Sequence, residues 1–361
     1  AGDTRCRVLS PIRSSAFDPR QRDVLRTLGW SAVKTIDTLL LLALPASGKS
    51  ELRRYLESVD PEVAARDFGL GPTVQLDDYP YVHLMRRISE GALRLGAPPV
   101  FFAANDQPFL DGRDWATLMA LINEDHAALG TAPAVPRHPT IWMLERLTAA
   151  RRSVGPRGVL DEMPSSVLRA LATRLDDEVA ELAEQRSATL GAYEPGVSTV
   201  LIEFARGGPE GEVAPLREPD GYAYSLSHLS TAILRRSSVL YVWVTPEDSR
   251  RRNEERAQPG PAGDASILHH GVPEVVMRRN YGSDDFIWLL GRGGGDAVEV
   301  TVGGDTYRLP AAVFDNRADH TSFLRTAPDS WDPGRVAALH EALAEAFATF
   351  DGRNMGAAGS S

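Results

Sequence analysis

Short apolar runs alternate along this chain with longer stretches of helical periodicity. Runs of five to seven mostly apolar residues, bounded by Gly, Pro, Ser or Asp, predict strands. Five of them stand out, at 37–43, 73–77, 198–204, 238–244 and 311–315. The first has no polar alternation between Thr38 and Leu42, which is typical of a strand buried on both faces of a parallel sheet.

Helical patterns lie between these runs, most clearly over 165–190, where a 3.6-residue apolar stripe begins at Val167. Strands that alternate with helices predict a three-layer α/β fold with a parallel sheet. The stretch 97–195 is too long for one crossover, so we expect a mostly helical insertion there. Alternation on both sides of Gly303 and Gly304 predicts a hairpin over 298–309.

Composition narrows the class of protein. The 361 residues are 43% hydrophobic and carry a net charge of −10, which argues against a general nucleic-acid binder. The one cysteine, Cys6, excludes an internal disulfide framework and a cysteine zinc site. No apolar stretch reaches membrane-spanning length and the first residues lack the apolar core of a signal peptide. We therefore expect a cytoplasmic protein with no membrane partner, and a disordered tail over 354–361.

The rarity of lysine in this chain makes Lys49 a candidate functional residue. The chain has only two lysines, Lys34 and Lys49, and every other basic position is Arg, a bias that suggests a GC-rich bacterial genome. Lys49 lies in Gly48-Lys49-Ser50, which follows the apolar run at 37–43 and a turn of small residues. Compact residues let the backbone approach an anion, and a lysine reaches it as a point charge.

This segment resembles a Walker A phosphate loop, with the order strand, GxxxxGK[ST], helix. The resemblance implies that the phosphates of ATP bind the loop and the following turn, and that the Ser50 hydroxyl holds Mg²⁺. The pattern departs at its first glycine, which is Ala43 here. A chance Gly-Lys-Ser in an ordinary strand, turn and helix is the alternative. The implied nucleotide-binding residues are Ala46, Ser47, Gly48, Lys49, Ser50 and Glu51.

The second strand ends in Asp77-Asp78, followed by Tyr79, Pro80 and Tyr81. Here the chain resembles P-loop kinases of the uridine kinase and nicotinamide riboside kinase type, within the P-loop NTPase superfamily. The resemblance implies that Asp77 is the catalytic base and that Asp78 assists with catalysis, Mg²⁺ or substrate. A turn and a helix N-cap would also explain two aspartates.

The third strand ends in Glu203, which matches the acid that those kinases place near Mg²⁺ or substrate. A structural ion pair is the alternative. Arg206 follows, either as a partner of Glu203 or as a ligand of a substrate anion. The fourth strand leads into an Arg-rich helix, and 246–282 resembles a kinase lid. Arg252 and Arg256 are candidates for stabilising the transferred phosphoryl group, or they lie on a solvated helix face.

Two further groups complete the candidate site. Asn316 and Arg317 follow the last strand, where the resemblance implies an adenine-binding loop and a plain β-turn is the alternative. Residues that follow the double aspartate are candidates for substrate binding, or they pack internally. These substrate candidates are Tyr79, Tyr81, Arg86 and Arg87, together with Glu203 and Arg206.

The sequence thus favours a single kinase-like domain over 1–361 with strand order 2-3-1-4-5. The expected activity is ATP-dependent, Mg²⁺-assisted phosphorylation of a hydroxyl on a nucleoside-, sugar- or metabolite-like molecule. Two alternatives stay open: a nucleotide-binding switch or regulatory ATPase, and a zeta-toxin-like kinase of nucleotide sugars. The sequence specifies neither the acceptor nor the oligomeric state.

Overall fold

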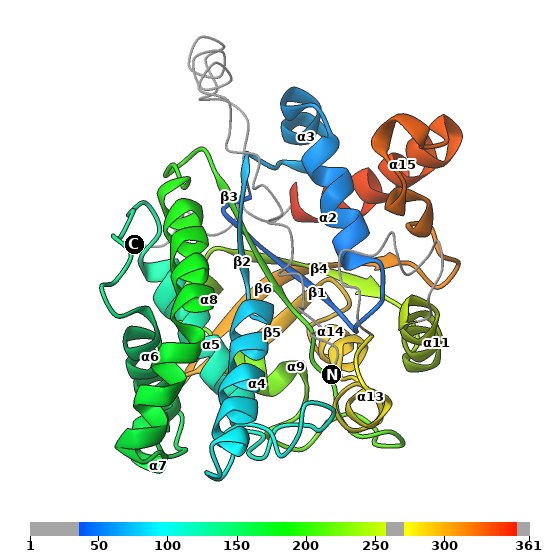
Figure 1. Cartoon of the computed structure of the whole chain (residues 1–361). Coiled ribbons are helices and arrows are strands. Elements are labelled where there is room, and N and C mark those ends of the chain that lie inside the picture. The colour runs from blue at the N-terminus through cyan, green and yellow to red at the C-terminus, as the bar shows by residue number, and fades with distance from the viewer. Residues whose placement is uncertain (1–35, 258–270, 352–361) are drawn as a thin grey trace.

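A six-stranded sheet forms the centre of the protein. The computed structural model describes residues 36–257 and 271–351 (Figure 1). The strand order is β2-β3-β1-β4-β6-β5; β5 pairs antiparallel with β6, and the other neighbours pair parallel. The strands are β1 (Thr38–Ala43), β2 (Thr73–Asp77), β3 (Thr199–Phe204), β4 (Ser237–Trp243), β5 (Ala297–Val302) and β6 (Asp305–Asp315).

The order differs from the five-strand order predicted from the sequence. The hairpin expected around Gly303 and Gly304 does form, but its second arm runs without a break into the run at 311–315, so that both belong to β6. Its first arm, β5, becomes a sixth strand at the edge of the sheet. Strand β5 can take that place because part of it is exposed and part is buried.

Strand β1 is buried along its whole length and contributes to two separate cores. Leu40 and Leu42 join one apolar cluster, whereas Leu39 and Leu41 join the other. Successive side chains of a strand point to opposite faces, so helices cover both faces of the sheet. The chain is therefore an α/β protein, as its strand and helix alternation predicts.

The helices divide between these faces (Figure 1). On one face pack α2 (Lys49–Ser58), α3 (Pro61–Phe68), the 3₁₀ turn η2 (Ser322–Arg325) and α15 (Pro333–Asp351). On the other pack α4 (Tyr79–Arg94), α5 (Asp114–Ala127), α6 (Pro139–Ser153), α7 (Val159–Glu162), α8 (Ser165–Gly191), α9 (Gly221–Ser227), α10 (Thr231–Leu234) and α14 (Phe286–Arg292). The remaining described helices are α11 (Pro246–Ala257), α13 (Glu274–Asn280) and the 3₁₀ turn η3 (Pro328–Ser330).

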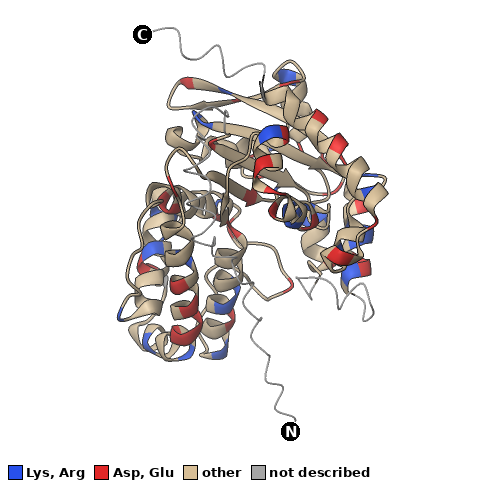
Figure 2. Cartoon of the chain, turned by 90° about the horizontal axis from the view of Figure 1, so that it is seen from above, with Lys and Arg blue, Asp and Glu red and all other residues tan. Residues whose placement is uncertain are grey.

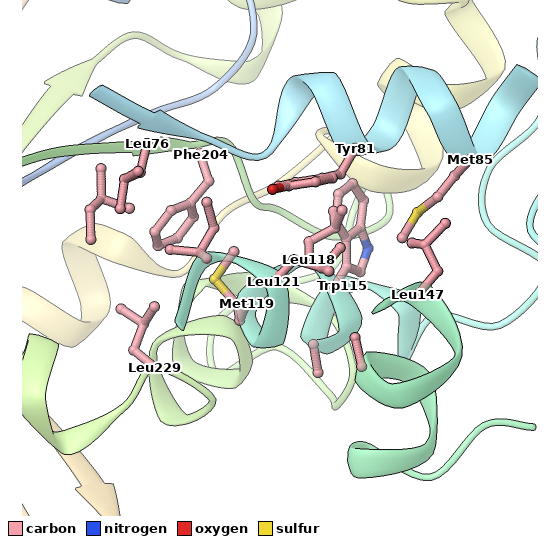
Figure 3. Packing of buried hydrophobic residues seen from close by; sticks show 14 of the residues in the cluster. Leu76, Tyr81, Met85, Trp115, Leu118, Met119, Leu121, Leu147, Phe204 and Leu229 are labelled. Atoms are coloured by element: carbon pink, nitrogen blue, oxygen red, sulfur yellow. The ribbon is translucent and has the colours of Figure 1, made fainter. Parts of the chain in front are cut away.

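The segment 97–195 holds four of these helices, α5 to α8, and no strand of the sheet. The long helix predicted over 165–190 is α8, and its stripe from Val167 through Leu171 to Val179 is buried. Figure 3 shows how this region joins the sheet: Tyr81 and Met85 of α4 face Trp115, Leu118 and Leu147. The insertion therefore shares one core with the sheet.

Helices α11 and α13 lie within the lid-like range 246–282. Residues 258–270 of this range and the tail expected at 354–361 lie outside the described residues. In the part of the chain that the structure describes, no helix has the length and apolar character needed to cross a membrane.

Acidic and basic residues are interspersed along the helices on both sides of the sheet (Figure 2). Some form ion pairs within one helix, such as Arg251 with Glu255 at 2.8 Å. Exposed pairs of this kind contribute little to stability. Buried charges form two groups: one lies within the helical insertion, as with Asp114 and Arg151, and the other lies at the carboxyl ends of the parallel strands, where open α/β sheets bind ligands.

Candidate phosphate-binding and acidic site

The turn between β1 and α2 has an unusual backbone. Ala46 and Gly48 have φ angles of 55° and 96°, so the chain visits the left-handed region twice within three residues. Such alternation turns successive N–H groups toward one concave side, which suits an anion. Ala43 is not among the described non-glycine residues with positive φ, so the missing first glycine imposes no strain there.

The amides at the start of α2 are unpaired. No N–H group from Gly48 to Ser50 donates a hydrogen bond to a described residue, and the Glu51 N–H contacts only its own carboxylate among the described residues. The first helical bond of α2 runs from Leu52 N to Gly48 O at 2.9 Å. The hydroxyl of Ser47 is buried and also lacks a partner. Unpaired amides at a helix N-terminus form a binding site for phosphate oxygens.

Side chains from outside the loop hold its carbonyl groups. Ser249 Oγ of α11 donates to Pro45 O at 2.7 Å, and Asn316 Nδ2 donates to Ser47 O at 2.6 Å. Arg252 Nη2 in turn donates to Asn316 O at 2.7 Å. These bonds fix the carbonyl side of the loop and leave its amides free.

The sequence assigns Asn316 to an adenine-binding loop and Arg252 to the transferred phosphoryl group, and in the structure both side chains bond backbone carbonyls. Asn316 is fully buried against the phosphate loop, and Arg252 is 4% exposed. Arg252 donates to two backbone carbonyls, Asn316 O and Arg317 O. Both residues therefore support the loop from behind.

An acidic group lies beside the loop, at the ends of β2 and β3. Asp77 and Glu203 are register partners on these neighbouring strands. Glu203 is 2% exposed and lies 3.9 Å from Lys49 Nζ. Its other oxygen accepts from Arg53 Nη1 and Gln75 Nε2, each at 3.3 Å. The structure thus brings Lys49, Asp77 and Glu203 together, as the sequence predicts.

Asp77 is protonated unusually easily. Burial raises its pKa to about 7, and the negative charges of Glu203 and Asp78 act in the same direction. Lys49 and the hydrogen bond from Tyr79 N, at 2.8 Å, oppose this shift. A carboxyl group that changes protonation near neutral pH is suited to exchanging a proton with a hydroxyl.

Asp78 has a different environment from its neighbour. It is 7% exposed, and its Oδ2 accepts from Arg206 Nη1 at 2.7 Å. Arg206 also donates to Ser225 Oγ, and its guanidinium lies 4.4 Å from the centre of the Trp115 ring. Arg206 therefore pairs with Asp78 rather than with Glu203, and this pair is enclosed in the core.

The residues at the loop fit a Mg²⁺ ion that bridges protein and phosphate. The Ser50 hydroxyl bonds no described residue. Glu203 accepts from Arg53 and Gln75 at Oε1 and has Oε2 3.9 Å from Lys49 Nζ, whereas Asp78 is held by Arg206 at 2.7 Å. Within 36–257 and 271–351 no cluster of three or more His, Cys, Asp or Glu side chains has metal-binding geometry. A site of one or two protein ligands completed by phosphate and water is the usual arrangement for Mg²⁺.

The arginines of α11 face different partners. Arg256 Nη2 donates to Glu51 Oε1 at 2.8 Å, beside the phosphate loop. Arg250 lies near Glu210, at 3.1 Å, away from that loop. Of the two catalytic candidates on α11, only Arg256 thus contacts the first turn of α2.

The substrate candidates on α4 fall into two groups with different surroundings. Tyr79 is 45% exposed next to Asp77, and Arg86 lies over the Phe102 ring and donates to Asn105 O. Tyr81 is buried instead, where its hydroxyl donates to Asp125 and accepts from Arg146. Arg87 pairs with Glu178 of α8. Tyr81 and Arg87 therefore bind the helical insertion, not the acidic group.

Beyond the last strand, Arg317 forms an exposed stack. Its guanidinium lies 3.9 Å from the centre of the Trp243 ring, and it pairs with Asp315 at 2.7 Å. Trp243 ends β4 and Asp315 ends β6, as neighbours in register. A guanidinium paired with a carboxylate thus covers one face of the Trp243 ring.

Sequence reasoning missed two arginines. Arg53 contacts Glu203, and Arg325 Nε donates to Glu51 Oε1 at 2.9 Å. Arg53 lies four residues after Lys49, so helical spacing could have placed both on one face. Arg325 carries no comparable signal, because its partner is 274 residues away in the chain.

Comparisons with known proteins found no match, whether to a family model, to a curated protein or to a solved structure. The resemblance to P-loop kinases therefore depends on the motifs of this chain. Its physical support is the arrangement of unpaired amides, lysine and carboxylates at one edge of the sheet.

Proposed function

We propose that the protein is a phosphotransferase that moves the γ-phosphoryl group of ATP to a hydroxyl of a small molecule. The observation that carries this proposal is the run of unpaired amides from Gly48 to Ser50, which includes Lys49, with Asp77 and Glu203 close to the Lys49 side chain. Phosphoryl transfer depends mainly on positioning and charge stabilisation, and these groups supply both.

In this reaction the loop amides and Lys49 bind the phosphate chain. The acceptor oxygen forms a bond to the γ-phosphorus while the bond to the β-γ bridging oxygen breaks, and ADP leaves. Asp77 accepts the hydroxyl proton, for which its carboxylate form is required. Mg²⁺, when bound by Ser50 and Glu203, would offset negative charge on the phosphate oxygens.

Two rival functions use the same loop. A nucleotide-binding switch would need no acceptor and no base, and the Asp77 carboxyl with its pKa of about 7 favours transfer over a switch. A zeta-toxin-like kinase of nucleotide sugars shares the proposed chemistry and differs only in the acceptor. A panel of nucleosides, sugars and nucleotide sugars, with ADP formation as the readout, distinguishes these acceptors.

The test of nucleotide binding is Lys49→Ala. Loss of a charge that contacts the transferred group should lower ATP turnover about 100-fold or more. Arg94→Ala, on the exposed side of α4, is the control and should keep the parental rate. Unchanged turnover in a folded Lys49→Ala protein would refute the proposal.

Asp77→Asn separates the kinase from the switch. The amide cannot accept the proton, so transfer to the acceptor should be lost while calorimetry shows ATP affinity within a few-fold of the parent. A variant that still phosphorylates the acceptor at the parental rate removes Asp77 from the mechanism.

A further inference from the structure

A buried acid occupies the first turn of the phosphate-loop helix. Glu51 directly follows the unpaired amides that end at Ser50, and the residue is 8% exposed. A helix N-terminus stabilises a carboxylate. However, a carboxylate at this place also repels the phosphate oxygens that the proposed function brings to the same amides, unless cations neutralise it.

Two arginines supply that neutralisation. Arg256 Nη2 and Arg325 Nε donate to the same oxygen of Glu51, Oε1, at 2.8 Å and 2.9 Å. One carboxylate against two guanidinium groups gives the cluster a formal charge of +1.

This Glu51 cluster, made of Glu51, Arg256 and Arg325, joins three distant parts of the chain. Glu51 lies at the start of α2, Arg256 near the end of α11, and Arg325 at the end of η2. The partners are 205 and 274 residues from Glu51. The cluster adjoins the phosphate loop, because Glu51 is two residues from Lys49.

The cluster has unused hydrogen-bonding groups. Glu51 Oε2 and Arg256 Nε are buried without a partner. Neither Nη nitrogen of Arg325 bonds a described residue, although its side chain is only 16% exposed. Buried polar groups are nearly always satisfied, so unused ones point to a missing ligand or water.

A structural ion pair in the same protein looks different. Arg151 meets Asp114 side by side, with Nε on Oδ1 at 2.9 Å and Nη2 on Oδ2 at 3.1 Å. Both carboxylate oxygens of Asp114 are used there. In the Glu51 cluster two guanidinium groups share a single oxygen, which leaves donors free on both arginines.

We propose that Glu51 holds Arg256 and Arg325 as a pair of guanidinium ligands for the phosphate chain of the bound nucleotide. This inference rests on the proposed function and adds two roles to it. Arg325 becomes a nucleotide-binding residue, and Glu51 becomes a positioning residue. Phosphate oxygens are suitable acceptors, because guanidinium groups bind them with paired, charge-assisted hydrogen bonds.

The experiment measures ATP and ADP affinity by calorimetry for the full chain and for Arg325→Gln. We expect the Kd of both nucleotides to rise about tenfold or more, as for a lost hydrogen bond to a charged group. Arg325→Lys should recover part of the loss. The matched control is Arg335→Gln, an exposed arginine on α15, which should bind both nucleotides as the parent does.

A second set of variants tests whether Glu51 positions Arg325. Without Glu51 to hold it, Arg325 should contribute less, so Arg325→Gln should raise the Kd by a smaller factor in a Glu51→Gln background than in the parent. Equal factors in both backgrounds would overturn the role of Glu51. Thermal unfolding of each variant confirms that the folded protein is being compared.

The outcomes separate this inference from the proposed function. If the parent protein binds no ATP, the proposed function fails. If the parent binds ATP and Lys49→Ala weakens that binding, but Arg325→Gln binds as tightly as Arg335→Gln, the proposed function stands and the role of Arg325 is refuted.

Discussion

A side chain at Gly48 of the phosphate loop would meet both backbone strain and a steric clash. Its φ of 96° disfavours any L side chain. A Cβ placed on Gly48 would lie 2.2 Å from Thr321 Oγ1 and 2.5 Å from Asn316 Nδ2. The substitution Gly48→Ala should therefore disturb the contact that fixes the loop from behind.

The size of the effect follows from two contributions. The left-handed backbone costs alanine about 1–2 kcal/mol, offset by about 0.4–1 kcal/mol from the stiffer unfolded chain. Displacing Asn316 also breaks its hydrogen bonds to Ser47 O and Thr321 Oγ1, and a buried polar group left unpaired costs about 1–3 kcal/mol. Gly96→Ala isolates the first contribution, because Gly96 has a φ of 74° and no atom within 4 Å of its added Cβ.

Urea unfolding of the parent, Gly48→Ala and Gly96→Ala measures both contributions. Gly48→Ala should lower the free energy of unfolding by about 1–3 kcal/mol more than Gly96→Ala does. It should also weaken ATP binding, whereas Gly96→Ala should not. If the two variants lose equal stability, Asn316 and Thr321 do not constrain the loop and the reasoning is refuted.

Three further predictions follow from the buried charges. Phosphoryl transfer should increase with pH through a midpoint of about 7, because the Asp77 carboxyl must be deprotonated to accept a proton; a pH–rate profile that is flat from pH 5 to 8 would contradict this. Arg206→Met should lower the free energy of unfolding by about 3–5 kcal/mol by leaving Asp78 buried and unpaired, and urea unfolding should show partial recovery when Asp78→Asn is added. Folding lowers the pKa of Glu51, so the stability that Glu51 contributes is present above its unfolded pKa and is lost as pH falls through its folded pKa. The variant Glu51→Gln should therefore make the free energy of unfolding less sensitive to acid. An unchanged acid dependence of that free energy would count against this prediction.

The sequence predicted β1, β3 and β4 because each is buried along nearly its whole length and is mostly apolar, and it predicted β2 from a shorter run with alternating burial. The first strand, expected at 37–43, is Thr38–Ala43, and the second matches at 73–77. Strand β6 was harder, since Pro310 interrupts its pattern and only five of its residues form an apolar run. Local patterns reveal burial, but they do not show where one strand joins the next.

The candidate site was predictable where its residues end consecutive strands. Lys49, Asp77 and Glu203 meet because parallel strands end at one edge of the sheet. The partners of Tyr81 and Arg206 were not predictable. Tyr81 bonds Asp125, 44 residues away, and Arg206 bonds Asp78, 128 residues away. Helical spacing predicts the direction in which a side chain points, but it does not identify the residue that packs against it.

The bond from Asn316 to the phosphate loop also constrains the order of folding. It joins Asn316 to Ser47 across 269 residues of chain, so the loop lacks this bond until β6 has been added to the sheet, whatever support Ser249 gives it earlier. Contacts of such long sequence separation form late, and domains made on the ribosome emerge N-terminus first. A growing chain that stops before β6 would carry the complete Gly-Lys-Ser motif without the side chain that orders it. We therefore expect competence to bind nucleotide to appear as a final step of folding, so that unfinished chains do not sequester ATP.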